Sequence, residues 1–251
     1  MNQKQLEAKL WSKVVKAINR FNMIADSDRV ILGVSGGKDS LTMLHILYLL
    51  KKYKKLNIEI IVGHMISDIN PGNIDSPQTI QNICKKLGII YDSETVSLTD
   101  KKYNKKNKVD CYWCSYQRRR IMFKLAEKHQ CNKIAFAHHT DDIVITNFMN
   151  LFYLSNILTM RVNHSFFNGQ FHIIRPLCLV REKEIIEYAK LMNFPSKPCN
   201  CKISKNGRRE KLAEILYNLE KQIPEIVNSV FWGFAKNNEK ISSIPDKFKT
   251  I

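Results

Sequence analysis

The sequence predicts an α/β protein: a parallel sheet with helices on both faces, followed by a helical C-terminal extension. Two observations predict this class. Short β-rich runs alternate with helical patterns through the first two thirds of the 251 residues, and this alternation is typical of parallel sheets. A glycine-rich loop at residues 35–40 joins the first strand to its helix, at the edge where such sheets bind ligands.

The elements are expected in the following order. The apolar run at 29–34 predicts a buried strand, and Leu41, Leu44 and Leu47 recur at helical spacing after it. Further strands are predicted at 58–65, 89–96, 133–137 and 171–175, and helices at 76–87, 115–129, 141–154 and 182–192. Two helices between 208 and 236, interrupted at Pro224, form the extension. We expect an N-terminal helix at 1–24, a main domain at 25–195 that includes a cysteine pair, and a cysteine loop with helices at 196–251.

The loop after the first strand is the most informative segment. It consists of Ser35, Gly36, Gly37, Lys38, Asp39 and Ser40. Backbone N–H groups and the positive end of the helix dipole would surround an anion there. The loop of kinases and GTPases needs four residues between its first glycine and its Gly-Lys pair, then Ser or Thr, and this chain lacks that spacing. A glycine-rich turn that merely starts a helix is the simpler alternative.

Charge points to a polyanionic partner. Lys and Arg total 40 against 23 for Asp and Glu, a formal net charge of +17, which favours association with nucleic acid. Basic residues cluster at 101–108, 118–120 and 205–211, with aromatic residues at 103, 112, 113 and 116. Phosphate binding with base stacking is one interpretation, and solvated helix faces are the other. No run approaches the roughly 20 apolar residues of a membrane span, and no signal-peptide core begins the chain, so we expect a cytoplasmic protein.

Seven cysteines in a chain without an export signal favour metal or redox chemistry over disulfides. Cys111 and Cys114 are separated by two residues and can converge on one metal. The pair could be a redox pair, half a zinc site, part of an iron–sulfur site, or chance. Cys199 and Cys201 lie in a proline-bounded loop that could supply a third thiolate. The remaining three sit in apolar runs and are predicted to pack in the core: Cys84, Cys131 and Cys178.

A second polar segment follows the strand predicted at 133–137. In His138-His139-Thr140-Asp141-Asp142, paired acids could support Mg²⁺ on the phosphates of a ligand, and a histidine could contact the same ligand. The alternative is that the two acids only cap their helix.

Six ordered motifs resemble those of the bacterial tRNA 2-thiocytidine biosynthesis family, within the ATP-pyrophosphatase (PP-loop) superfamily. They are Ser35-Gly36-Gly37-Lys38-Asp39-Ser40, Cys111-x-x-Cys114 with Arg118-Arg119, Ala137-His138-His139-Thr140-Asp141-Asp142, Ile174-Arg175-Pro176-Leu177, Arg181-Glu182-Lys183-Glu184, and Pro198-Cys199-Asn200. The resemblance spans residues 25–225 and implies the adenine nucleotide alpha hydrolase-like fold.

The resemblance also implies an activity. ATP would adenylate the C2 oxygen of cytidine 32 in the tRNA anticodon loop, and sulfur would then displace AMP. It implies catalytic roles for Lys38 and Asp39, and a 4Fe-4S cluster held by Cys111, Cys114 and Cys199 with one iron left open for sulfur. The nucleotide and Mg²⁺ would be bound by residues 35–40 with His139 and Asp142. The implied partners are tRNA and a sulfur donor such as a cysteine desulfurase, and a homodimer suits the size of a tRNA.

The chain departs from the family pattern at one position. The family usually has Pro-Cys-Asn-x-Cys, whereas Cys201 arrives one residue early here. Cys201 could be a bystander, a sulfur relay or a fourth cluster ligand. Three other functions remain open: a tRNA 2-thiouridine synthetase, a lysidine-forming synthetase that has no need of Cys111 and Cys114, and a non-catalytic basic RNA-binding or redox protein.

Overall fold

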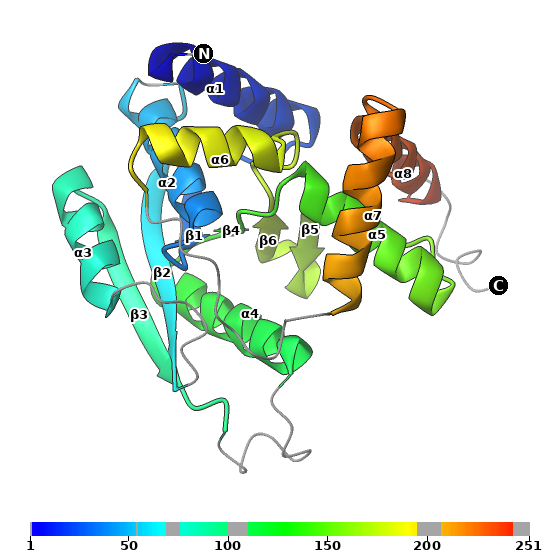
Figure 1. Ribbon diagram of the computed structural model, residues 1–251. Coiled ribbons are helices and arrows are strands. Elements are labelled where there is room, and N and C mark those ends of the chain that lie inside the picture. Colours follow the sequence, from blue (N-terminus) through cyan, green and yellow to red (C-terminus); the bar gives the residue numbers. More distant parts are fainter. Residues whose placement is uncertain (1, 54, 69–75, 100–109, 195–206, 243–251) are drawn as a thin grey trace.

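The computed structural model describes the chain except residues 1, 54, 69–75, 100–109, 195–206 and 243–251 (Figure 1). Within the described residues, six strands form one sheet in the order β3-β2-β1-β4-β6-β5. The strands are β1 (Arg29–Gly33), β2 (Glu59–Ser67), β3 (Ile90–Val96), β4 (Lys133–Ala135), β5 (Asn163–Phe166) and β6 (Phe171–Ile174). All neighbours run parallel except β5 and β6. The predicted parallel sheet is confirmed, and β5 is an antiparallel edge strand that the sequence did not predict.

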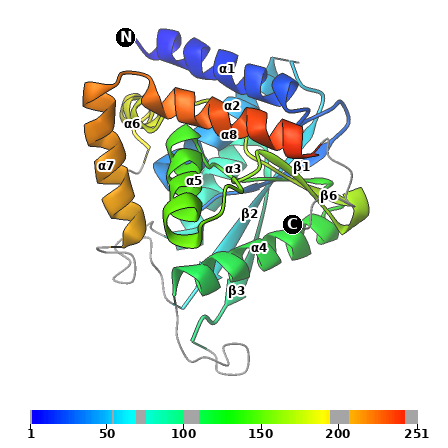
Figure 2. The same ribbon diagram turned by 90° about the vertical axis from the view of Figure 1, so that its right-hand side faces the viewer.

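Helices cover both faces of this sheet, as predicted. They are α1 (Gln3–Arg20), α2 (Lys38–Lys52), α3 (Ser76–Leu87), α4 (Cys111–Lys128), α5 (Thr140–Leu154), α6 (Glu182–Leu191), α7 (Arg208–Gln222) and α8 (Ile226–Ser242), with a short 3-10 turn, η1 (Phe167–Gly169). Figure 2 shows α4 on one side of the sheet and α1, α2, α5 and α8 on the other. One helix therefore packs on one face of the sheet, and several pack on the other.

Alternating residues of each strand build two separate cores. Val30 and Leu32 of β1 face the larger core under α1, α2 and α5, whereas Ile31 faces the smaller core under α4. The register aligns Ile31 with Ile61 of β2 and Ile134 of β4, and both partners also belong to the smaller core. Because the side-chain period of a strand is two, the parallel register sends each set to one face.

The helix that carries the cysteine pair begins earlier than the sequence predicts. We expected it near Ser115, but α4 begins at Cys111. The carboxylate of Asp110 accepts a hydrogen bond of 2.8 Å from the Trp113 backbone N–H, which is the usual way an aspartate caps a helix. Both cysteines therefore lie in the first turn of α4 rather than in front of it.

The terminal helices pack on the main body. Helix α1 contacts α2 and α6, and both α7 and α8 contact α5. The C-terminal pair is interrupted at Pro224 as expected, since α7 ends at Gln222 and α8 begins at Ile226. The division at residues 24 and 195 stays a prediction. None of the helices in the described part of the chain is long and apolar enough to cross a membrane.

We expect Gly63→Val to lower the free energy of unfolding by about 1 to 3 kcal/mol, the usual cost of overpacking. A Cβ atom at Gly63 would lie 2.9 Å from Met122 Cε and 3.0 Å from Ile31 Cδ1, where α4 packs on β2. Urea denaturation measures the change. Gly233→Ala is the control, because nothing lies within 4 Å of a Cβ atom there and alanine favours helix. Equal stability of the two variants would contradict the close packing of α4.

Candidate active site

The phosphate-loop candidate lies where the strand order of the sheet reverses. Strand β1 stands between β2 and β4. The segments that follow β1 and β4 therefore start side by side and lead in different directions. Open α/β sheets bind their ligands in the crevice at such a point. Gly36 adopts φ 82°, a conformation that favours glycine. Gly37 is the N-cap of α2 and provides no side-chain cap. The first N–H groups of α2 are therefore not capped by a side chain and can receive an anion.

Lys38 is held between two acids at the start of α2. Its Nζ lies 3.0 Å from Asp39 Oδ1 and 3.1 Å from Glu182 Oε1 in the first turn of α6. Burial lowers the pKa of Lys38, but the carboxylates of Asp39 and Glu182 outweigh it and raise the pKa above the ordinary value. Lys38 therefore carries a full positive charge at the loop. The Ser40 hydroxyl donates to the Gly37 carbonyl (3.0 Å) and lies 3.4 Å from the Ser35 hydroxyl, which fixes the loop.

His139 joins the loop to the β4–α5 connection. The ring is buried, with 4% exposure. Its Nε2 lies 4.0 Å from Asp39 Oδ1 and 3.3 Å from Asp142 Oδ2, and its Nδ1 lies 3.6 Å from Asp141 Oδ2. Burial lowers the pKa of His139, and the three carboxylates together raise it above the ordinary value. The Asp142 N–H donates to Nδ1 at 3.4 Å. The three carboxylates therefore favour the protonated ring, whereas this contact uses Nδ1 as an acceptor.

The two acids of this segment have different partners. Asp141 pairs with Arg181 (2.9 Å) and accepts a 2.7 Å bond from the Glu182 N–H. Burial raises the pKa of Asp141, and His139 and Arg181 lower it well below its usual range. Asp142 is more available, because its main cationic neighbours are His139 and the half-exposed Arg209 of α7 at 2.5 Å. Asp141 is therefore tied to the start of α6, and the Asp142 side chain is the more exposed of the two acids.

We expect the stability that His139 contributes to be present at low pH and lost at high pH. Its unfolded pKa is about 6.5 and its folded pKa is higher. The contribution is therefore full below about pH 6.5 and disappears as pH rises through the folded pKa. The measurement is the unfolding free energy of wild type minus that of His139→Gln between pH 5 and 9. His172→Gln is the control with the opposite slope, because burial and Lys133 lower the pKa of His172. A flat difference for His139 would contradict the raised pKa of this ring.

The cysteine pair stands at the carboxyl edge of the same sheet. Cys111 is exposed and Cys114 is half-buried. The indole of Trp113 donates to the Leu98 carbonyl (3.2 Å), and the Leu98 N–H donates to Asp68 just beyond β2 (2.8 Å). The first turn of α4 is thereby fastened to the ends of β2 and β3. Two thiols of one helical turn can bind one metal or cluster.

The third predicted ligand, Cys199, and the ambiguous Cys201 lie outside the described residues. The chain resumes at Gly207, and Figures 1 and 2 both place the first turn of α7 near the first turn of α4. Extended chain spans at most about 3.3 to 3.6 Å per residue, so the nine residue-to-residue steps from Cys199 to Arg208 could cover roughly 30 Å. The chain length therefore permits Cys199 to reach the Cys111 and Cys114 pair.

The acids at the loop suit a magnesium ion. Mg²⁺ is usually held by one or two carboxylates together with substrate phosphates, and Asp39 and Asp142 approach the same His139 nitrogen from two elements. Within the part of the chain that the structure describes, no three His, Cys, Asp or Glu side chains converge as a complete metal site. Phosphate oxygens would have to complete the coordination.

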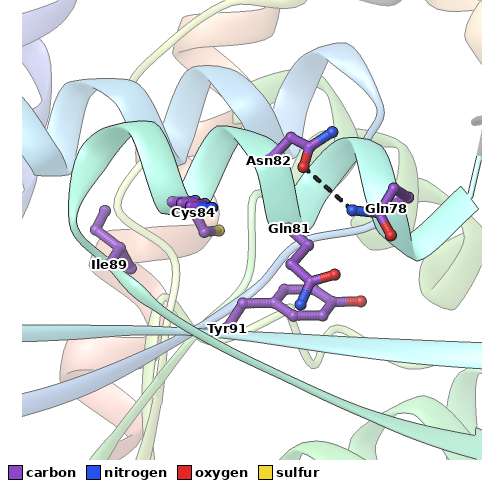
Figure 3. Close-up of a pocket in the computed structure, with 7 residues that line it drawn as sticks. Gln78, Gln81, Asn82, Cys84, Ile89 and Tyr91 are labelled. Carbon is purple, nitrogen blue, oxygen red and sulfur yellow. Dashed lines mark hydrogen bonds between the residues drawn. The ribbon is translucent and has the colours of Figure 1, made fainter.

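A pocket elsewhere on the molecule does not include these residues. It has a volume of about 400 Å³ and lies between α3 and β3, where Figure 3 shows the Gln78 amide donating to Asn82. Its lining is Gln78, Gln81, Asn82, Cys84, Lys85, Ile89 and Tyr91.

The predicted burial of Cys84, Cys131 and Cys178 is confirmed. Burial raises the pKa of both the Cys84 and the Cys131 thiol to about 11, so these cysteines stay neutral and serve packing.

Several residues of the site could not be assigned from the sequence. Glu182 and Arg181 belong to a recognised motif, and Arg209 to a basic cluster, but their partners stand 144, 40 and 67 positions away in the chain. Arg181 also pairs with Glu220 of α7 at 2.8 Å. The available signal was the grouping of charged residues at the start of α6. The roles of Lys38, Asp39, His139, Asp142 and the cysteines stay predictions.

The fold and the loop define a PP-loop ATP-binding protein, and residues 6–204 match the PP-loop domain family. The chain is 37% identical over 234 residues to the tRNA-cytidine(32) 2-sulfurtransferase of Ralstonia pickettii, covering 92% of this chain and 73% of that protein. It is 36% identical to tRNA-cytidine(32) 2-sulfurtransferase 1 of Francisella tularensis, covering 97% and 91%. The chain belongs to the tRNA-cytidine(32) 2-sulfurtransferase family.

A solved structure supports the fold. The U34-tRNA thiolase NcsA from Methanococcus maripaludis, which was solved with its 4Fe-4S cluster, superposes with a TM-score of 0.72 and covers 94% of this chain and 80% of that one. Its sequence identity is 24%, so the likeness extends to the fold and not to the substrate.

Proposed function

We propose that the chain is an ATP-dependent tRNA sulfurtransferase that converts cytidine 32 of the anticodon loop to 2-thiocytidine. The observation that carries the proposal is the meeting of Lys38 and Asp39 with His139 and Asp142 at the switch point of the sheet. Family membership supplies the substrate class. The proposal also places the protein in the cytoplasm, where tRNA is modified.

Two bond exchanges make up the reaction. The C2 oxygen of cytidine attacks the α-phosphorus of ATP, and pyrophosphate leaves as the bond between the α- and β-phosphates breaks. Sulfide then bonds to C2, the C2–O bond breaks and AMP leaves. The N–H groups of the loop and Lys38 would stabilise the departing pyrophosphate. Asp39 and Asp142 would hold Mg²⁺, which neutralises phosphate charge when bound.

The cysteine pair would supply the sulfur side of the site. Cys111 and Cys114, with Cys199 as the third ligand, would hold a 4Fe-4S cluster that offers sulfide to C2. The surface around the pair suits RNA. Tyr112 and Tyr116 are 74% and 45% exposed, and the exposed residues 118–120 add three arginines on the same helix. Exposed aromatic rings beside basic residues favour stacking on unpaired bases.

The test is an oxygen-free assay with purified protein, ATP, sulfide and an unmodified tRNA transcript. We expect tRNA-dependent pyrophosphate release and 2-thiocytidine in the nucleoside mass spectrum. Thiolated uridine in place of thiolated cytidine would indicate the uridine-type enzyme. Binding of tRNA without pyrophosphate release would indicate the non-catalytic alternative.

We also propose a homodimer and a desulfurase-type sulfur donor. Residues 143–160 contain no charged residue. Five of their large apolar side chains are exposed, by 41% to 67%: Phe152, Tyr153, Leu154, Ile157 and Leu158. Two chains that each carry +17 can approach most easily at an uncharged apolar surface, so a second copy is the expected occupant. Sedimentation equilibrium of the wild type and of Leu154→Glu checks it, and a monomeric wild type would contradict it.

A further inference from the structure

Arg175 has no acidic partner among the residues that the structure describes. It follows β6, and its guanidinium donates to the Arg161 carbonyl. Its Nε is shut off from solvent and has no hydrogen-bond partner within the described chain. Arg181 and Arg209, by contrast, both pair with carboxylates. Burial lowers the pKa of Arg175 to about 10, and Arg119 of α4 lowers it further against a small opposite effect of Cys178. Arg175 is still protonated at neutral pH.

His138 is a second unsatisfied group beside it. Ala135 of β4 pairs with Ile174 of β6, so the segments that follow these strands leave the sheet side by side. The Nδ1 of His138 is also buried without a hydrogen-bond partner among the described residues. Burial, and then the positive charge of Arg175, lowers the pKa of His138 to about 3. The ring is neutral, so one of its nitrogens can donate a hydrogen bond.

Unsatisfied buried donors around an arginine favour an anion. A buried polar group without a partner costs free energy, and an arginine fork matches the geometry of phosphate oxygens. The position is separate from the pyrophosphate loop, because β6 lies one strand beyond β4 and the loop follows β1. The position adjoins α4, where Arg119 is close enough for its charge to lower the pKa of Arg175.

We propose that Arg175 and His138, with Arg119 at the rim, bind one phosphodiester group of the RNA substrate. This inference rests on the proposed function. Pyrophosphate is not the expected ligand, because the loop and Lys38 already provide a site for it. The exposed arginines at 118–120 of α4 extend the positive charge from Arg175 to the surface. A backbone phosphate held there would fix the RNA beside the loop without reading its sequence.

The first test measures affinity without ATP. A fluorescent RNA hairpin that carries a seven-base anticodon loop is titrated with wild type, Arg175→Met and Lys51→Met. Lys51 is an exposed lysine in the last turn of α2, at the end opposite the phosphate loop. We expect about tenfold weaker binding for Arg175→Met and a salt-dependence slope reduced by about one, and little change for Lys51→Met. Equal losses in both variants would overturn the site. Arg175→Lys keeps the charge and serves if Arg175→Met fails to fold.

The second test identifies the source of the phosphate. Hairpins with one neutral methylphosphonate at each loop linkage in turn are titrated with wild type and Arg175→Met. We expect one linkage whose neutralisation weakens wild-type binding about tenfold and leaves Arg175→Met unaffected. Additive losses at every linkage would overturn the assignment. Pyrophosphate affinity should be the same in both proteins. Weaker pyrophosphate binding by Arg175→Met would show that Arg175 binds the nucleotide instead of the RNA. Failure of wild type to bind any hairpin would instead count against the proposed function.

Discussion

We expect Cys111→Ala and Cys114→Ala each to abolish the formation of 2-thiocytidine, while a single round of tRNA-dependent pyrophosphate release continues. Both thiols belong to the first turn of α4, which packs on the sheet face opposite α2 and its loop. Loss of one thiolate removes a ligand that the cluster needs, but it leaves Lys38 and the N-terminus of α2 intact. Nucleoside mass spectrometry measures the first result, and a single-turnover pyrophosphate assay measures the second.

The matched control is Cys131→Ala, which removes a buried cysteine with 3% exposure from the core under α4. We expect this variant to lose some stability and to retain thiolation. Cys199→Ala should behave like the α4 variants. Unchanged thiolation in Cys111→Ala, Cys114→Ala and Cys199→Ala would refute the proposed cluster. Loss of thiolation in Cys131→Ala as well would point to misfolding of the helix.

Most of the sheet was predictable because each buried strand is a short apolar run. The runs at 29–34 and 133–137 correspond to β1 and β4, and both are flanked by segments with helical spacing. Strand β5 was missed because Asn163-His164-Ser165-Phe166 is polar and only four residues long. Its position depends on pairing with β6, which is a tertiary interaction. The start of α4 was missed because the capping role of Asp110 was overlooked.

The site was predictable as a set of segments but not as a set of contacts. The loop at 35–40 and the acids after β4 were identified because a strand–loop–helix junction has a sequence pattern. The pairing of Lys38 with Glu182 depends on how α6 packs against α2, and spacing along the chain carries no such information. The same is true of Arg209, whose bond to Asp142 requires α7 to pack on α5.

Three cationic side chains of the candidate site contact acidic side chains. Lys38, His139 and Arg209 each contact a carboxylate that is predicted to serve Mg²⁺ or the loop. These contacts neutralise the local charge. If Mg²⁺ and ATP bind here as proposed, contacts to phosphate and metal would replace these ion pairs.

We expect Lys38→Met to lower the rate of tRNA-dependent pyrophosphate release by about 10²- to 10³-fold, the usual loss when one electrostatic group that stabilises a transition state is removed. Negative charge accumulates on pyrophosphate as the bond to the α-phosphorus breaks, and Lys38 is the positively charged side chain at the start of α2. The pKa of Lys38 is raised by Asp39 and Glu182, so the cation is present throughout the working pH range. Stopped assays at saturating ATP measure the rate.

Two controls separate this effect from binding and folding. Lys51→Met removes one positive charge from the other end of the same helix and should retain the wild-type rate. The folded state of Lys38→Met should survive, because Asp39 and Glu182 are partly exposed (34% and 46%) and water can solvate them once the lysine is gone. RNA affinity without ATP should also be unchanged. A Lys38→Met protein that releases pyrophosphate at the wild-type rate would show that the loop does not stabilise the leaving group, and the assignment of residues 35–40 as the pyrophosphate site would fail.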